Sequence, residues 1–150
     1  MEHYEVSNWS QLGFASLHNK IYWEMQSYLG IGTGAHSFLN LDGELGERFS
    51  FQKKISSYQL KRLDQMEIDL DKRSYNDYFK EKIMTGLRTS AGVLLSPKEL
   101  KLIQGLLTKE DHQEFLTVQD NHLYLDEDEW IRENYWITLI NDFYSSHIVH

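Results

Sequence analysis

The chain has 150 residues and a formal net charge of −8; 41% of the residues are hydrophobic, 25% are charged, 13% are aromatic and none is cysteine. This composition predicts one compact soluble domain, or one and a half. The lack of cysteine excludes, within this chain, a disulfide framework, a thiolate zinc site and a cysteine-held iron–sulfur cluster. No apolar run is long enough to span a membrane and the first residues lack the pattern of a signal peptide, so we expect a cytoplasmic protein.

The first half is predicted to hold short strands and loops. Residues 4–9 alternate like a strand, and residues 28–32 indicate a second strand that leads into a glycine-rich turn. Residues 8–23 have no clean period, so we expect an ordered loop rich in aromatic side chains. Apolar residues in 51–70 have roughly helical spacing, and the polar tract 69–74 marks a boundary between the two halves.

The second half has clearer helix signals. Apolar residues recur every four positions from Tyr75 to Leu87, which predicts a helix over 77–89 with one buried face, and Gly92 then breaks the chain. Ser96 and Glu99 form a capping box with Pro97 at the first helical position, which predicts a second helix.

The remaining residues predict a short acidic helix, a hairpin and a last helix. The acidic helix covers 109–115, and the β-like runs 116–118 and 122–125 are joined by a turn. Asp126 and Glu129 can cap the last helix. The acidic run 126–129 is better explained as favourable charge at a helix N-terminus than as a metal site. The order of helices and hairpin resembles a winged helix.

The charge of the second half argues against nucleic acid as a partner. Residues 1–75 carry ten acidic and eight basic side chains, net −2, and residues 76–150 carry thirteen and seven, net −6. The candidate recognition helix, 109–115, has three carboxylates and one lysine. In a DNA complex this would place net negative charge against the phosphates, which is unfavourable.

Residues 30–35 form a glycine block, Gly-Ile-Gly-Thr-Gly-Ala, that fits the pattern G-x-G-x-x-A. Glycines let the backbone approach a ligand, and exposed amides can bind a carboxylate or phosphate, but a tight structural turn is an equally good interpretation. A dinucleotide fingerprint needs a helix directly after the block. Residues 36–43 do not resemble one, so we do not expect a Rossmann site.

Residues 18–23 place a histidine beside an amide and two large aromatic rings. The imidazole of His18 could ligate a haem iron while Tyr22 and Trp23 pack on the porphyrin. On these residues alone, a structural cluster is the favoured alternative. His36 could approach the same place.

Several short blocks together resemble a known family. They are Tyr4-Glu-Val-Ser-Asn8, Gly13-Phe14, His18-Asn-x-x-Tyr-Trp23, Tyr28-Leu-Gly-Ile-Gly-Thr-Gly-Ala-His-Ser37, Glu81-x-Ile-Met-x-Gly-Leu-Arg88 and Gly92-Val93. In this order they resemble the C-terminal part of HemW, the family of radical-SAM haem chaperones, which are often labelled as anaerobic coproporphyrinogen III oxidase-like proteins.

The resemblance implies an α+β fragment of a longer protein. Residues 1–75 would be the last portion of a partial (β/α) radical-SAM barrel, and 76–150 a winged-helix-like C-terminal domain. The parent would use S-adenosylmethionine and a 4Fe-4S cluster whose ligands lie upstream, so this chain alone is expected to be catalytically inactive.

The resemblance also implies site residues. Haem binding is carried over to His18, Asn19, Tyr22 and Trp23, with His18 as the candidate ligand of the haem iron. The S-adenosylmethionine side of the barrel is carried over to Gly32, Thr33, Gly34 and Ala35.

The implied function is binding of haem and its transfer to haem-requiring proteins, with peripheral membrane contact through these acceptors. The alternative is an oxygen-independent coproporphyrinogen III oxidase of porphyrin biosynthesis, which decarboxylates two propionates oxidatively. A third alternative is a winged helix that binds protein or DNA. A slice of barrel leaves strand edges and apolar surface uncovered, so we also expect the fragment to self-associate or residues 1–50 to be disordered.

Overall fold

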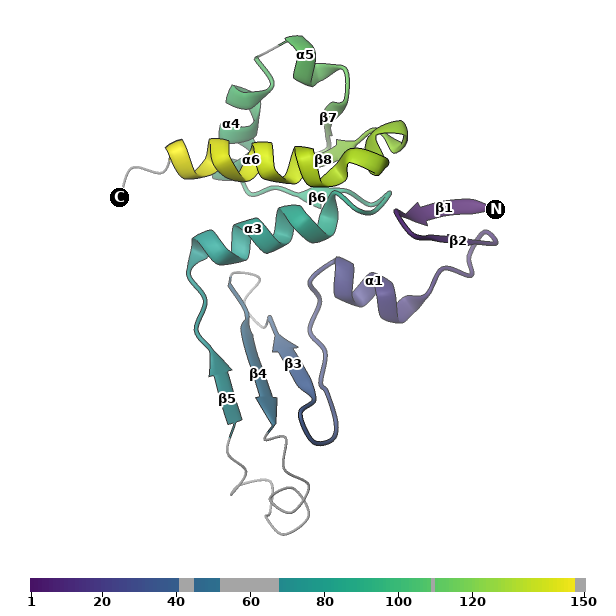
Figure 1. Ribbon diagram of the computed structural model, residues 1–150, viewed down its shortest axis with the longest axis vertical. Coiled ribbons are helices and arrows are strands. Elements are labelled where there is room, and N and C mark those ends of the chain that lie inside the picture. The colour runs from purple at the N-terminus through teal and green to yellow at the C-terminus, as the bar shows by residue number, and fades with distance from the viewer. Residues whose placement is uncertain (41–44, 52–67, 109, 148–150) are drawn as a thin grey trace. The chain divides into compact units, whose positions relative to one another are not determined.

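The computed structural model describes residues 1–40, 45–51, 68–108 and 110–147. It has a mixed α+β fold with three small sheets, which confirms the predicted α+β class (Figure 1). The chain forms two compact units, one made of Met1–Glu24 with Phe79–His150 and the other of Met25–Tyr78. Among the described residues, no helix is long and apolar enough to cross a membrane.

The first unit combines the two ends of the chain. The N-terminal strand is held by the segment that follows the first long helix, since the amide of Val6 donates to the carbonyl of Arg88 at 3.0 Å and the amide of Ser90 donates to the carbonyl of Tyr4 at 3.1 Å. The predicted boundary at residue 75 lies close to the end of the second unit at Tyr78. The division of a longer protein into domains there stays a prediction.

The helices and the hairpin predicted for the second half are present with shifted ends: the acidic helix is shorter than predicted, residue 109 lies outside the described residues, the last helix begins with a 3-10 turn, and strand β6 (Val93–Leu94) was not predicted. Helix α3 covers Tyr75–Gly86, and α4 covers Pro97–Leu106 with the capping box of Ser96 and Glu99. The other elements are β6 (Val93–Leu94), α5 (Glu110–Gln113), β7 (Leu116–Gln119), β8 (His122–Leu125), the 3-10 helix η2 (Glu127–Arg132) and α6 (Glu133–His147).

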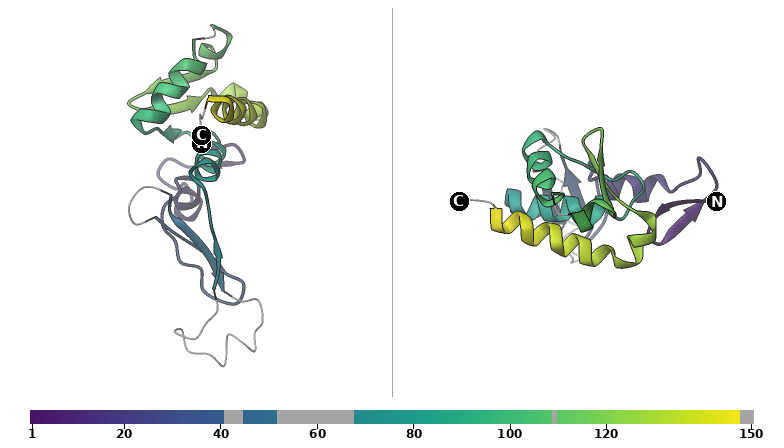
Figure 2. Two further views of the ribbon diagram at one scale, coloured as in Figure 1. Left: turned by 90° about the vertical axis from the view of Figure 1, so that its left-hand side faces the viewer. Right: turned by 90° about the horizontal axis from the view of Figure 1, so that it is seen from above.

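These elements enclose one apolar core. Strands β6, β8 and β7 form an antiparallel sheet in that order, and the hairpin turns at Asp120 and Asn121, both with positive φ. Phe79 of α3 stacks on Tyr144 of α6 with ring centroids 3.8 Å apart. Figure 2 shows α6 beside α4, consistent with their contacts. The core members with no exposed surface are Phe79, Ile83, Leu87, Ile103, Leu123 and Ile140, and Leu106 and Leu116 are 1% exposed.

The prediction of one strand over residues 4–9 is wrong, because the chain reverses within it. Strands β1 (Glu2–Glu5) and β2 (Asn8–Ser10) form an antiparallel hairpin. The carboxylate of Glu5 accepts hydrogen bonds from the side chain of Asn8 and the amide of Ser7, and this pairing stabilises the turn.

The prediction of a loop over residues 8–23 is also wrong. Besides β2, this segment contains helix α1 (Leu17–Trp23), whose N-cap Ser16 accepts a hydrogen bond from the amide of Asn19 at 3.3 Å. The helix is seven residues long and buries none of them completely, so it has no apolar period that sequence analysis could detect. Its cap was the available signal.

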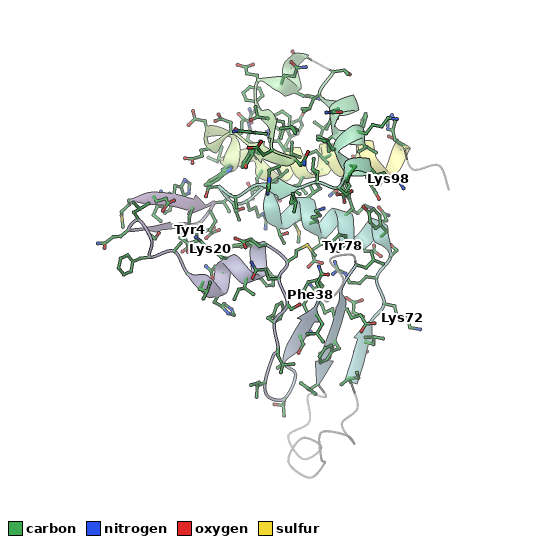
Figure 3. All side chains as sticks on the ribbon, turned by 180° about the vertical axis from the view of Figure 1, so that it is seen from behind. Tyr4, Lys20, Phe38, Lys72, Tyr78 and Lys98 are labelled. Carbon is green, nitrogen blue, oxygen red and sulfur yellow. The ribbon has the colours of Figure 1, made fainter. Side chains whose placement is uncertain are left out.

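The second unit contains one antiparallel sheet, in the order β3 (His36–Leu39), β4 (Glu47–Phe51) and β5 (Ile68–Asp71). Phe38 of β3 is buried, and the guanidinium carbons of Arg48 and Arg73 lie 5.9 and 5.8 Å from its ring centroid. Figure 3 labels Phe38 and, in the same unit, Tyr78. Burial and the neighbouring charge of Arg48 lower the pKa of Arg73 from its ordinary value.

Three predictions for this unit need correction. The strand predicted over 28–32 is only an isolated bridge between Tyr28 and Phe38, because the glycines after it turn the chain. The helix predicted over 51–70 is wrong at both ends, where Phe51 and residues 68–70 belong to strands, and residues 52–67 lie outside the described residues. The polar tract 69–74 begins inside β5. The described strand pairs are antiparallel, and the barrel stays a prediction.

Candidate functional site: a pocket between the N-terminal hairpin and helix α1

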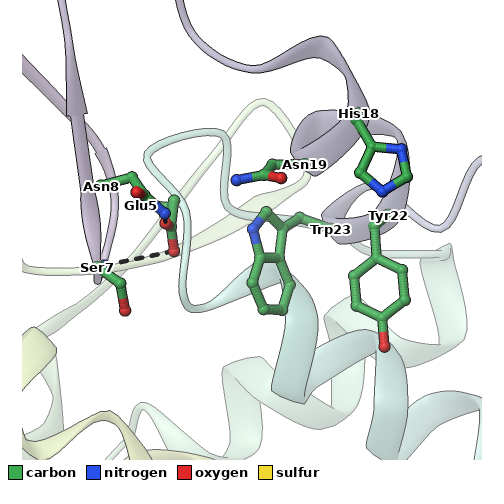
Figure 4. Close-up of a pocket in the computed structure, with 7 residues that line it drawn as sticks. All are labelled: Glu5, Ser7, Asn8, His18, Asn19, Tyr22 and Trp23. Carbon is green, nitrogen blue, oxygen red and sulfur yellow. Dashed lines mark hydrogen bonds between the residues drawn. The ribbon is translucent and has the colours of Figure 1, made fainter.

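A pocket of about 360 Å³ lies within the first unit, between the β1–β2 hairpin and α1 (Figure 4). This volume is near the lower end of the range for small-molecule sites, roughly 300–1,000 Å³. One wall comes from the hairpin and the other from the helix. The lining residues are Glu5, Ser7, Asn8, His18, Asn19, Tyr22 and Trp23.

Helix α1 explains why four residues of the motif 18–23 reach the same pocket. On a helix, residues three and four positions apart are neighbours on one face. Two adjacent pairs with this spacing can therefore line the same surface. His18 and Tyr22 therefore form one pair, with Asn19 and Trp23 next to them. The rings of Tyr22 and Trp23 meet edge to face, with centroids 5.3 Å apart. The structure thus brings together all four residues that the sequence analysis assigned to haem.

The helical wall offers polar groups to a ligand. His18 is exposed, and its imidazole has no hydrogen-bond partner among the described residues. Trp23 is half-buried, and its indole N–H is shielded from solvent without an acceptor in the described part of the chain. An unpaired buried donor costs about 1–3 kcal/mol. A ligand that supplied an acceptor would remove this penalty.

The hairpin wall is built around a buried carboxylate. Glu5 is 1% exposed and is held by Asn8 and by the amide of Ser7 at 3.4 Å. These three residues were not predicted to belong to the site, although they lie in the block 4–8 that carried the family resemblance. Strand β1 also pairs with residues 88–90, and this contact between distant segments has no local sequence signal.

The glycine block belongs to the other unit, Met25–Tyr78, and its geometry favours a structural turn. The amide of Gly34 donates to the carbonyl of Phe51 at 3.2 Å, and the amide of Ala35 donates to the carbonyl of Gly32 at 3.3 Å, so neither is left for a ligand. A Cβ at Gly30 would lie 2.2 Å from the carbonyl oxygen of His36, which explains the glycine. The role of Gly32, Thr33, Gly34 and Ala35 towards S-adenosylmethionine stays a prediction.

Two other candidates have structural explanations. His36 starts β3 in the second unit, at the place where a dinucleotide fingerprint would need a helix. In the acidic run, Asp126 caps η2, and the carboxylate of Glu129 accepts from Arg132 Nε at 3.0 Å and Trp136 Nε1 at 2.8 Å. These bonds lower the pKa of Glu129. No group of three or more metal-ligating side chains occurs among the residues that the structure describes.

Comparisons with known proteins find relatives with two names. The haem chaperone HemW of Lactococcus lactis subsp. lactis is 34% identical over 99 residues, which are 66% of this chain and 25% of that protein. HemW of Synechocystis sp. is 35% identical over 95 residues, 61% of this chain and 22% of that protein. The mitochondrial radical S-adenosyl methionine domain-containing protein 1 of Bos taurus is 31% identical over 103 residues, 60% of this chain and 22% of that protein.

The chain spans about a quarter of the length of the curated relatives it matches. No family model matches the chain, and no solved structure matches it. The likeness to HemW that the motifs indicated is nevertheless confirmed by these relatives.

Proposed function

We propose that this HemW-like chain is the C-terminal region of a haem chaperone, and that it holds haem reversibly in the pocket between the β1–β2 hairpin and α1. The observation that carries the proposal is the convergence of His18, Asn19, Tyr22 and Trp23 on one pocket. Related proteins named as haem chaperones supply the class of ligand.

The side chains present fit such a cargo. When bound, haem supplies an iron that accepts an imidazole nitrogen as an axial ligand. The imidazole of His18 is available for this role because it has no partner in the described residues. Tyr22 and Trp23 supply aromatic surface for the macrocycle, and Asn19 and the indole N–H supply hydrogen bonds to its polar groups.

The exposure of the site suits transfer. His18 is exposed and Tyr22 is 43% exposed, so the pocket covers only part of a bound macrocycle. A cargo held by one axial ligand and a few ring contacts can be released to an acceptor protein. A resident haem would instead be expected in a closed apolar cavity, where most of its surface is buried.

The rest of the proposal concerns the longer protein. S-adenosylmethionine and a 4Fe-4S cluster would be bound mainly by segments outside this chain, which has no cysteine. The order α3, α4, α5, hairpin and α6 supports a winged-helix-like C-terminal region after the last portion of the barrel. We expect this chain alone to be unable to cleave S-adenosylmethionine, and detection of 5′-deoxyadenosine from the isolated chain would contradict this.

The test is a haemin titration followed by absorbance, with His18→Ala and, as a matched control, His36→Ala. His36 is also an exposed histidine but lies in the other unit. We expect a saturable Soret shift that His18→Ala abolishes and His36→Ala leaves unchanged. A shift that is indifferent to His18 would overturn the assignment.

The alternative, a coproporphyrinogen oxidase, is tested on the complete protein. Formation of protoporphyrinogen from coproporphyrinogen would favour the oxidase over the chaperone. The names of the matched relatives favour the chaperone.

A further inference from the structure

A second, smaller pocket of about 120 Å³ lies in the same unit and shares Trp23 with the first. Its other walls come from the start of β1, from α1 and from the segment after α3. This volume is about a third of that of the first pocket, so the second pocket suits a small polar group better than a large ring system.

Both pockets are lined by residues of β1, in which the pairing register shifts between His3 and Glu5. Glu5 lines the first pocket and Tyr4 the second, while Thr89, which lines the second, forms a bridge with Glu5. A molecule packed on Trp23 in the first pocket is thus close to the second one.

Lys20 gives the second pocket its positive charge. It lies on α1 between the motif residues, and Figure 3 shows Lys20 and Tyr4 on the neighbouring helix and strand. No carboxylate of the described residues lies within salt-bridge distance of its ammonium group. The hydroxyls of Thr89 and Ser90 donate to backbone carbonyls at 3.0 and 3.3 Å, so their protons are not available to an anion. The ammonium group of Lys20 and the indole N–H of Trp23 are donors that line the pocket and can bind one. Glu24 is the one acidic side chain there and makes other contacts.

We propose that the second pocket is a carboxylate subsite, in which Lys20 binds the ionised side arm of the molecule held in the first pocket. This rests on the proposed function: if the cargo is haem, the side arm is a propionate. A propionate carries its carboxylate beyond the ring edge on a short flexible chain of methylenes, which suits a small cationic pocket next to the ring-binding Trp23. Lys20 is a positioning and specificity residue, while His18 remains the candidate iron ligand.

The first experiment compares haemin with its dimethyl ester, whose side arms are uncharged, on the wild-type chain and on Lys20→Gln. The control is Lys98→Gln, an exposed lysine of α4 outside both pockets. We expect Lys20→Gln to weaken haemin binding roughly twofold to fivefold, the range for an exposed charge pair, and to leave ester binding unchanged. Equal haemin affinity of Lys20→Gln and wild type, or equal weakening of both ligands, overturns the subsite.

A second experiment separates this proposal from the proposed function. Failure of the wild-type chain to bind haemin would reject the haem site, whereas the carboxylate subsite is tested alone by titrating sodium propionate and recording backbone amide NMR shifts. We expect shifts at residues 89–91 that are lost in Lys20→Gln and kept in Lys98→Gln. The absence of any shift at these residues in the wild-type chain overturns the subsite.

Discussion

At the scale of single residues, Trp23 links the two pockets, and its indole N–H is the group whose removal is most informative. Trp23→Phe keeps most of the ring surface and removes a donor that has no acceptor among the described residues. We expect haemin affinity to fall roughly threefold to tenfold, since a hydrogen bond contributes about 0.5–1.5 kcal/mol net. The melting temperature should change little, because removal of the unpaired donor stabilises the protein and the loss of ring area destabilises it.

Trp130→Phe is the matched control for this prediction. The indole nitrogen of Trp130 is likewise shielded and without an acceptor in the described structure, but Trp130 lines neither pocket. Titrations of both variants, with thermal unfolding in parallel, check the expectation. An equal effect of the two substitutions on haemin affinity would show that the indole of Trp23 has no special role.

Two glycines near helix ends should respond in opposite ways to alanine. At Gly86 a Cβ would lie 2.5 Å from Val93 Cγ2, whereas at Gly105 the nearest atom, Phe143 Cζ, is 3.7 Å away. We expect Gly86→Ala to lower the free energy of unfolding by about 1–3 kcal/mol through overpacking. Gly105→Ala should raise it by up to about 1 kcal/mol, because alanine favours the helix. Urea unfolding measures both, and destabilisation by Gly105→Ala would contradict the packing at α4.

At the scale of elements, the start of α4 makes stability depend on pH. Burial raises the pKa of Glu99, but hydrogen bonds from Lys82 at 2.8 Å and from the amide of Ser96 at 2.7 Å outweigh burial, so the pKa lies below its ordinary value of 4.5. A carboxyl whose pKa is lowered by folding stabilises the protein above its unfolded pKa. This stabilisation is lost as the pH falls through the folded pKa.

Glu99→Gln should therefore be less stable than wild type at pH 7, and the difference should shrink as the pH falls below about 4.5. The control is Glu114→Gln, an exposed carboxylate outside the core. Urea unfolding across this range checks the prediction. A difference between Glu99→Gln and wild type that does not change with pH would mean that the ionised carboxylate is not the stabilising group.

The elements of the C-terminal half were predictable because local and long-range signals agree there. The capping box of Ser96 and Glu99 marks the start of α4, and the buried Phe79, Ile83 and Leu87 form the apolar stripe of α3 and the turn after it. The N-terminal elements lacked this agreement. Helix α1 buries none of its residues completely, and the β1–β2 turn depends on a side-chain pairing between Glu5 and Asn8 that leaves no periodic pattern.

One wall of the candidate site was predictable from the sequence. The residues His18, Asn19, Tyr22 and Trp23 lie within one short segment, so a local motif was enough to identify them. The opposite wall includes β1, which pairs with residues 88–90. These two segments are far apart in the sequence, so no local motif predicts their contact. Lys20 was part of the same segment, but only the second pocket distinguishes it from an ordinary exposed lysine.

At the scale of the whole molecule, exposed apolar side chains predict self-association. The segment between β2 and α1 and its neighbours carry several, which are Trp9 (56% exposed), Leu12 (84%), Phe14 (78%) and Leu17 (71%). Apolar patches of this kind mark surfaces that contact another molecule. We expect concentration-dependent self-association in light scattering, reduced by the double substitution Leu12→Ser and Phe14→Ser. A monomer at all concentrations would contradict this prediction.

The central claim, that haem binds between the hairpin and α1, is tested most directly by locating haemin on the chain. Ferric haem is paramagnetic and broadens the amide resonances of nearby residues in a ¹⁵N-labelled protein. We expect substoichiometric haemin to broaden residues 5–8 and 17–23 first, and His18→Ala to remove this pattern. Broadening centred elsewhere, for example around His122 or His147, or a pattern that His18→Ala leaves intact, would contradict the account.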